Sequence, residues 1–436
     1  MKNIDEIRTE LSNLPKGYIS IKTISGKKYY YLKYYENNKQ ISKYIKNSEI
    51  DDLKNKLKKR KELEKELKEI EKSSKKIHAL SANAKNYTGS IMSGDIKVAT
   101  YKNGELIYKN EKLCPLLIKR TNNISAFFKG RVIDSSRTNS RLLKKVMNIT
   151  TKNDEHISLF VYGTVITDNY WFKPSGSQLK YKDISFNNDY YSDLALKGEL
   201  AFYPKSSKHT PQITAIGSFE KCWKKINDKW WMYKKGSNEQ IFSELFCSLL
   251  ASKLNIPTAI YEYDDGYIRT LNFADKYNFE PMIGLMGDEE SYDAIFNSLF
   301  SIDSKLADQY LLLSFFDCVI NNIDRHNENL GFLRNKKTGK IISLAPNFDN
   351  NLALLGYDKK LIMIPENDGF IKLFIKFLKE NKNAYKRYKE LKIPKLNKQI
   401  VDECLYKIPI KLDGYDIPKY IINRYNYLVS FKNRKS

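Results

Sequence analysis

The sequence has 436 residues, of which 42% are hydrophobic and 29% carry a charge. That balance supports a folded core and excludes a mostly disordered chain, a collagen-like fibre and a membrane protein. No run of about 18 apolar residues occurs, and the charged N-terminus shows no signal peptide. We therefore expect a cytoplasmic protein of two or three domains that makes no use of a membrane.

The chain is strongly basic, with 75 Lys and Arg residues against 51 Asp and Glu residues and a net charge of +24. Such a charge attracts polyanions, such as nucleic acid, nucleotides or an acidic partner. A Lys-rich proteome encoded by AT-rich DNA would give the same balance, so charge alone does not establish nucleic-acid binding. The cysteines and histidines are scattered, which predicts reduced thiols and no Cys/His zinc site.

Residues 1–80 are predicted to form a small β-sheet followed by a long charged helix. Three runs rich in aromatic and β-branched residues fill 15–45, separated by turn-forming Ser-Gly and Asn-Asn pairs. A charged helix is expected over 48–77. The Lys-rich, Tyr-rich sheet could follow a nucleic-acid backbone and stack bases, which would give weak DNA binding. A small sheet with solvated lysines is the equally open alternative.

A linker and a hairpin are expected over 81–112, followed by a mixed region in which 141–149 is predicted helical and 157–172 extended. Further on, the hydrophobic pattern becomes sharper. The elements predicted there are strands at 213–226 and 229–236, a helix at 238–254, strands at 258–263 and 266–273, a helix at 306–322, and mostly helices after 366.

Three polar residues follow the apolar helix at 306–322. Asp324 comes closely after it, Asn329 lies five residues later, and Asp349 follows a predicted hairpin that runs out and back. The hairpin should return Asp349 beside the other two, giving one pocket with two carboxylates and a carboxamide. Phosphoryl transfer from ATP uses such a set, because one carboxylate orients the acceptor hydroxyl and an Asp and an Asn bind Mg²⁺. Taken singly, each residue could be an ordinary cap or turn residue.

The upstream segment contains matching groups. Lys234 and Lys235 end a predicted strand, and the helix that follows carries Glu239 and Glu244. A kinase uses a strand lysine and a helix glutamate to hold the ATP phosphates. The pair Gly217-Ser218 would let the backbone approach a phosphate, although no P-loop pattern occurs in the chain.

These segments resemble the HipA-like serine/threonine kinases of bacteria and phages. The resemblance covers about residues 113–425 and rests on NNIDRHNENLGF, LAPNFDNN, WWMYKKG with its following helix, and TDNYWF. It implies an α+β, protein-kinase-like fold of two lobes, with an N-lobe at 113–280 and a mostly helical C-lobe at 281–436. It also implies an ATP- and Mg²⁺-dependent enzyme that phosphorylates Ser or Thr hydroxyls of a protein substrate, in a family that includes toxin–antitoxin kinases.

The resemblance assigns roles within the loop that follows the apolar helix. Asp324 would be catalytic, and Asn329 and Asp349 would hold Mg²⁺. Arg325 would either contact a phosphate or brace Asp349, and the two roles remain open.

The resemblance also assigns the phosphate-binding lysine. Lys234 directly follows the Tyr of the motif and is preferred, with Lys235 as the fallback. The similarity of SELFCS to the family's helix favours Glu244 as its partner, although Glu239 lies closer to the apolar face of that helix. Autophosphorylation at a serine in the phosphate-covering loop, here Ser218, is a further property that the resemblance implies.

The sequence departs from the family in two places. Its phosphate-covering loop is short and has a single glycine, Gly217, and residues 1–80 are no part of a kinase fold. That N-terminal part resembles a β-hairpin-plus-helix unit of phage and mobile-element proteins, some of them DNA-binding. Two alternatives stay open: a lipid or small-molecule kinase, which also uses a DRHxxN loop, and an inactive kinase fold that serves as a DNA-binding or toxin–antitoxin module.

Overall fold

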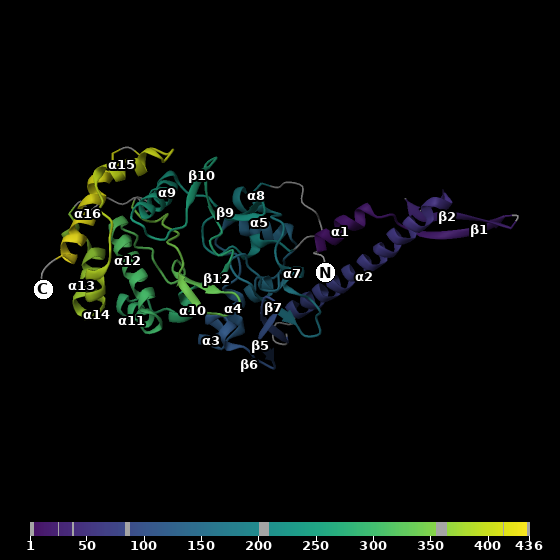
Figure 1. Ribbon diagram of the computed structural model, residues 1–436, viewed down its shortest axis with the longest axis horizontal. Helices are drawn as coiled ribbons and strands as arrows, with labels where there is room; N and C mark the ends of the chain where they lie inside the picture. The colour runs from purple at the N-terminus through teal and green to yellow at the C-terminus, as the bar shows by residue number, and fades with distance from the viewer. Residues whose placement is uncertain are drawn as a thin grey trace. The chain divides into compact units, whose positions relative to one another are not determined.

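The structure is a computed structural model that describes most of the chain. The described residues are 4–24, 26–36, 39–82, 88–199, 209–354, 364–412 and 414–433. The chain forms two compact units: a small unit of Met1–Tyr87 with Lys173–Ser185, and a large unit of Thr88–Phe172 with Phe186–Ser436. Both contain helices together with antiparallel strands (Figure 1), which confirms the expected α+β class.

The small unit is built on a three-stranded antiparallel sheet. Its elements are α1 (Ile4–Asn13), β1 (Tyr18–Ile24), β2 (Lys27–Glu36), β3 (Lys39–Ile45), the 3-10 helix η1 (Asn47–Glu49), α2 (Ile50–Ala82) and α7 (Tyr181–Ile184). Arg60 ties α2 to α1, because its Nη1 donates hydrogen bonds to the carbonyls of Leu11 at 2.8 Å and Leu14 at 2.7 Å. The predicted strands and helix are present, while 25, 37–38 and 83–87, at the expected turns and linker, lie outside the described residues.

The first sheet of the large unit has the order β6-β5-β4-β7. Its strands are β4 (Gly89–Ser93), β5 (Ile96–Lys102), β6 (Glu105–Tyr108) and β7 (Tyr170–Pro174). The stretch predicted to be extended, 157–172, is strand only near its end, and it begins inside the helix α6 (Asp154–Leu159). The reason is a local cap: the side chain of Asn153 accepts hydrogen bonds from the N–H groups of Glu155 and His156.

The second sheet has the order β10-β11-β9-β8. Its strands are β8 (Lys221–Ile226), β9 (Lys229–Lys234), β10 (Tyr261–Asp264) and β11 (Tyr267–Leu271). The prediction of a strand from 213 is wrong, because the chain there forms a 3-10 helix, η3 (Pro211–Thr214), and a loop. The Gln212 side chain pairs instead with the edge of β8, accepting from the Trp223 N–H at 2.9 Å and donating to its carbonyl at 2.7 Å.

The third sheet, β12-β13-β14, contains the hairpin predicted between Asn329 and Asp349. Its strands are β12 (Tyr277–Pro281), β13 (Gly331–Asn335) and β14 (Ile341–Leu344). The Asn335 side chain accepts hydrogen bonds from the N–H groups of Lys337 at 2.9 Å and Thr338 at 3.0 Å, which closes the turn.

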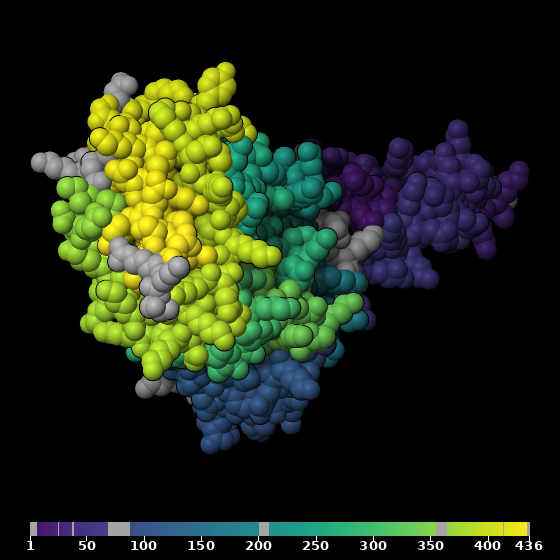
Figure 2. Space-filling view, turned by 60° about the vertical axis from the view of Figure 1, so that its left-hand side comes forward, coloured from purple at the N-terminus to yellow at the C-terminus, as the bar shows by residue number. Residues whose placement is uncertain are grey.

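Helices make up most of the rest of the large unit. They are η2 (Glu111–Leu113), α3 (Leu116–Thr121), α4 (Ile124–Lys129), α5 (Thr138–Val146), α8 (Ser192–Lys197), α9 (Asn238–Lys253), α10 (Ile283–Met286), α11 (Tyr292–Ile302), α12 (Ser304–Ile320), η4 (Pro365–Asn367), α13 (Gly369–Glu380), α14 (Lys382–Glu390), α15 (Lys398–Tyr406) and α16 (Ile417–Lys432). The part after 281 is mostly helical, as expected, and the segments after 364 lie together on one face of the large unit (Figure 2).

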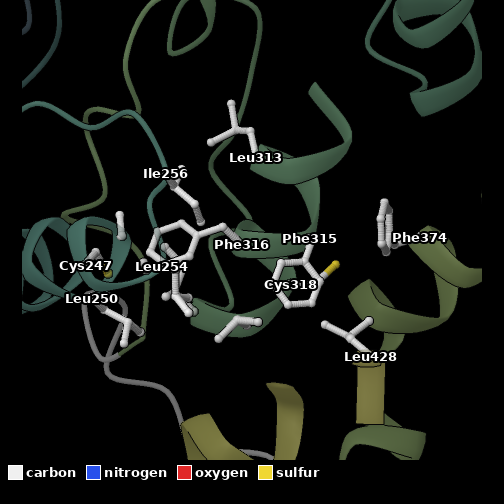
Figure 3. Close-up of a cluster of buried hydrophobic side chains, with 14 of the residues drawn as sticks. Cys247, Leu250, Leu254, Ile256, Leu313, Phe315, Phe316, Cys318, Phe374 and Leu428 are labelled. Atoms are coloured by element: carbon white, nitrogen blue, oxygen red, sulfur yellow. The ribbon is translucent and has the colours of Figure 1, made fainter. Parts of the chain in front are cut away.

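The main hydrophobic core lies among these helices. Leu250 of α9, Phe316 of α12, Phe374 of α13 and Leu428 of α16 are all fully buried within it (Figure 3). Helix α12 is buried along most of its length and ends at Asn321, whose left-handed backbone (φ 55°) closes the helix. The loop with Asp324 therefore starts directly from a helix of the main hydrophobic core.

All five cysteines are buried and unpaired: Cys114, Cys222, Cys247, Cys318 and Cys404. Among the described residues, none of the helices combines the length and the apolar character needed to span a bilayer.

Candidate active site

The lysine at the end of β9 contacts the acid that follows the β13–β14 hairpin. Lys234 is buried, and its Nζ forms an ion pair with Oδ1 of Asp349. The ring centroid of Phe219 lies 5.0 Å from the same Nζ, a cation–π contact. Lys235 is exposed, because neighbouring side chains of an extended chain point to opposite sides. Of the two candidate lysines, the structure therefore brings Lys234 to this acid.

The glutamate of α9 that interacts with this pair is Glu244. It is fully buried; its Oε1 accepts a hydrogen bond from the Asn350 N–H at 3.0 Å, and its Oε2 has no hydrogen-bond partner. Burial raises the pKa of Glu244, and the charge of Lys234 opposes that rise. Glu239, in contrast, lies on the first turn of α9, where a hydrogen bond from Ser237 lowers its pKa. The site therefore contains Glu244.

Asp349 is held in an unusual backbone conformation. Its φ of 58° lies in the left-handed region, which few residue types other than glycine, asparagine and aspartate adopt. Its N–H donates to the Tyr261 hydroxyl at 3.3 Å. Burial acts to raise the pKa of Asp349, but the charges of Lys234 and Lys221 outweigh burial and hold that pKa at about 2. Asp349 is therefore ionised, and strained charged residues of this kind are common at functional sites.

The loop after α12 presents two oxygen-bearing groups to the same place. Asn329 Nδ2 donates to the Asp324 carbonyl at 3.1 Å. No hydrogen bond from a described residue reaches Asn329 Oδ1 or the Asp324 carboxylate. Burial and the charge of Asp349 raise the pKa of Asp324, while His326 and Lys234 lower it. The charge of Asp324 therefore interacts with the charges of Asp349 and Lys234, and Asn329 is hydrogen-bonded to the backbone of Asp324.

Arg325 braces this loop from within. Its Nε and Nη2 bind the buried carboxylate of Asp317 on α12 at 3.0 and 2.9 Å, and its Nη1 donates to the carbonyls of Asn329 and Phe348, both at 2.8 Å. Nη2 also bonds to two asparagine side-chain oxygens. An arginine has five N–H donors, and all are used here. Of the two roles left open for Arg325, its contacts favour the bracing role, since no donor is left for a ligand.

Gly217 and Ser218 lie in the loop between η3 and β8. Gly217 has a φ of +98°, and a Cβ added there would lie 2.6 Å from Nζ of Lys221. Lys221 is buried at the start of β8 and lies directly opposite Lys234 in the β8–β9 pairing. The loop that was expected to cover phosphates therefore lies against a second lysine, and the Ser218 side chain is exposed.

The donor set fits a magnesium ion that is bound together with phosphates. Within the described part of the chain, no group of three or more His, Cys, Asp or Glu side chains is placed to hold a metal. Asp349 and Asn329 offer one ionised carboxylate and one free amide oxygen. Mg²⁺ commonly takes one or two carboxylates and completes its octahedron with water and substrate phosphates.

The positions of three residues in the site were not predicted from the sequence. Asp317 had a signal, because an acid that directly follows the apolar run at 311–316 needs a buried partner. Lys221 is close to Ser218 in the sequence, but its position opposite Lys234 becomes visible only from the pairing of β8 with β9, and Tyr261 carries no signal that we can name. Cross-strand and cross-loop neighbours of this kind depend on register, which one sequence does not fix.

Comparisons with known proteins assign little. A family model described as a domain of unknown function, DUF6788, matches residues 2–55, and no curated protein matches the chain. Among solved structures, the chain is similar to HipA of Shewanella oneidensis MR-1, from a toxin–antitoxin complex with HipB and operator DNA, at 14% identity and a TM-score of 0.48, over 79% of this chain and 96% of that one. It is also similar to the proinflammatory kinase CtkA of Helicobacter pylori, at 17% identity and a TM-score of 0.38, over 49% of this chain and 90% of that one.

Proposed function

We propose that the large unit is a HipA-like protein kinase that transfers the γ-phosphoryl group of ATP to a Ser or Thr hydroxyl. The observation that supports it best is the meeting of Lys234, Glu244 and Asp349 from β9, α9 and the loop after β14. Burying two acids beside a lysine costs stability. Groups with strongly shifted pKa values at one point are typical of a catalytic site.

Each residue has a role that its contacts allow. Lys234 would exchange Asp349 for phosphate oxygens, while Glu244 keeps it in place. Asp349 and Asn329 would hold Mg²⁺, which when bound would neutralise charge on the transferring phosphoryl group. Asp324, whose carboxylate has no hydrogen-bond partner among the described residues, would accept the hydrogen bond of the acceptor hydroxyl and take its proton.

The test is transfer of labelled phosphate from ATP and Mg²⁺ by the full chain. The wild-type protein is offered a mixture of basic and acidic protein substrates and, separately, phosphoinositide vesicles. Asp324→Asn should lower transfer to protein by about 10²–10⁴-fold, the usual contribution of a positioned base. Glu328→Gln is the matched control, because Glu328 is an exposed acid of the same loop.

The outcomes separate the three readings of the site. Transfer to protein that Asp324→Asn loses and Glu328→Gln keeps supports the proposal. Label on lipid alone indicates a lipid kinase. Binding of ATP without any transfer indicates an inactive kinase fold, and an Asp324→Asn variant as active as wild type removes that residue from the chemistry.

A second function, nucleic-acid binding by the small unit, is favoured by one face of its sheet. The β1–β2–β3 register places on one side five tyrosines, three lysines and no acidic residue. They are Tyr18, Tyr29, Tyr31, Tyr35, Tyr44, Lys22, Lys27 and Lys33. Tyr35 is 69% exposed and Tyr44 52% exposed, so their rings are available for stacking on bases. We call these residues the tyrosine face.

The tyrosine face is tested with full-length protein and labelled single- and double-stranded DNA. Replacing Tyr35 and Tyr44 by Ser should weaken binding, and binding by the wild type should fall steeply with salt, as counterion release requires. The matched control replaces Tyr30 and Tyr34 of β2 by Ser, since these point to the other side of the sheet. Equal losses in both variants, or no binding at low salt, would contradict this function.

A further inference from the structure

Strand β1 is an open edge of the sheet in the small unit. Its inner side pairs with β2 (Figure 1), and no other strand in the described part of the chain pairs with its outer side. An edge strand presents a row of N–H and C=O groups that can pair with a further strand. With seven residues, β1 is long enough to form such a ladder along its whole length.

The other edge strands of the described sheets carry protection that β1 lacks. Lysines on the edge, a covering segment and short strands are common ways to prevent strand addition. Strand β3, the opposite edge of the same sheet, carries two exposed lysines, Lys39 and Lys43. The edge strands of the large unit have at most six residues, and the longest of them, β8, is covered by the side chain of Gln212. Strand β1 is longer than these and has a single lysine, Lys22.

Large apolar side chains are exposed on both faces of β1. Tyr18 is 51% exposed, Ile21 55% and Ile24 54%. The β1–β2 register places Tyr18 and Ile24 on the side of the tyrosine face and Ile21 on the other side. A partner lying on one face of the sheet would leave the other face uncovered. A strand added beside β1 would cover part of both, so the exposed side chains favour strand addition.

A second copy of β1 fits this edge in one register. A two-fold axis through Ile21 overlaps the two strands over their full length and places no lysine opposite a lysine. The opposed residues are then Ile21 with Ile21, Tyr18 with Ile24, Ile19 with Thr23, and Ser20 with Lys22. An axis through Lys22 would oppose two like charges, which is destabilising. An axis through Ser20 would leave Ile24 beyond the end of the partner strand.

We propose that β1 is a dimer interface, at which two copies of this chain pair their β1 strands antiparallel about Ile21 and form one six-stranded sheet. The interface is isologous, because each copy contributes the same residues. An axis perpendicular to the sheet keeps the same side of both copies facing the same way. The two tyrosine faces therefore join into one continuous surface. The dimer requires neither phosphate transfer nor nucleic-acid binding.

The first experiment is sedimentation velocity of the full chain over a wide range of concentrations, at moderate salt because two copies of net charge +24 repel each other. The wild type should form a dimer. Ile21→Lys should weaken the dimer about tenfold or more, because it opposes two like charges on the axis. Ser42→Lys is the matched control, since it adds the same charge at an exposed position of the opposite edge, β3. Ile21 is exposed in the single copy, so its replacement should leave the fold intact.

The second experiment locates the interface by crosslinking. All five native cysteines are buried, so a short bismaleimide should react with an engineered surface thiol first. Ile21→Cys should give a crosslinked dimer, because the Cβ atoms of directly opposed residues lie about 5 Å apart, and Ser42→Cys should give almost none.

The outcomes decide the proposal. A dimer that Ile21→Lys weakens, that Ser42→Lys keeps and that Ile21→Cys crosslinks supports it. A chain that stays monomeric at every concentration overturns it. So does a dimer that Ile21→Lys leaves unchanged, or one that Ser42→Cys crosslinks as well as Ile21→Cys, because the contact would then lie on another surface.

Discussion

A phosphate could replace the carboxylate of Asp349 as the partner of Lys234. Asp349 is ionised and reaches Lys234 from a separate loop, so the contact can open without unfolding either strand. We expect Lys234→Met to abolish measurable ATP binding and phosphate transfer. Lys235→Met, which removes the adjacent exposed charge, should leave both within about twofold, since exposed charges contribute little. Equal losses in the two variants would show that only net charge matters.

Arg325 stabilises the fold through its contacts and has no donor left for a ligand. Arg325→Met would leave Asp317 charged and buried without its partner, which costs about 3–5 kcal/mol. Arg387→Met is the matched comparison, because Arg387 also binds an acid, Asp308, but in a half-exposed pair for which about 1 kcal/mol is expected. Chemical denaturation of the two variants measures the difference. Similar losses would mean that the Arg325 network does not brace the loop.

The pH dependence of stability should report on Lys221. Its pKa is about 8 in the folded protein against an ordinary value of 10.5, so between these values the unfolded chain holds a proton that the native chain lacks. Stability should therefore rise with pH through this window, by on the order of 1–3 kcal/mol. Denaturation of wild type and Lys221→Met at pH 7 and 9.5 tests this, with Lys225→Met as control because Lys225 lies on the same strand and pairs with the exposed Asp228. A rise that persists in Lys221→Met would assign it to other groups.

At the scale of elements, the loop between η3 and β8 is the natural place for regulation. Ser218 is exposed there, next to the glycine that covers Lys221. A phosphate on Ser218 would add about 1.5–2 negative charges, and it would compete with bound phosphates for Lys234. We expect mass spectrometry to find phosphate on Ser218 after incubation with ATP and Mg²⁺ in wild type, and none in Asp324→Asn. Labelling of other serines alone would exclude this switch.

Local sequence patterns predicted most of the helices and strands that form the site, whereas only the structure shows which of these elements pair. The DRH loop and the hairpin after it follow from a helix end and a turn, which are short-range patterns, whereas the choice of Lys234 over Lys235 came from the resemblance to the HipA-like kinases. The strand expected from 213 was wrong because the Gln212 side chain takes the place of a strand at the edge of β8. The position of Lys221 opposite Lys234 was missed for a related reason, since cross-strand partners depend on tertiary register.

At the scale of the whole molecule, the small unit is not simply the first part of the chain. Residues 173–185 return to it from within the sequence of the large unit. Deleting residues 1–87 would therefore remove the part of the small unit to which this segment belongs. For this reason the experiments on either unit use the full chain with point substitutions.

The buried cysteine thiols can report where the native protein opens locally. Each cysteine reacts with a labelling reagent only when the structure around it opens, so the five rates measure the stability of five separate places. Cys222 is adjacent to Lys221 on β8, and Cys247 lies one turn beyond Glu244 on α9, whereas Cys404 is on α15. ATP should slow labelling of Cys222 and Cys247 by about tenfold or more at saturating ligand, and leave Cys404 nearly unchanged. Uniform slowing at all five would instead indicate that the ligand stabilises the protein as a whole, and an unchanged Cys222 would place the bound phosphates away from β8.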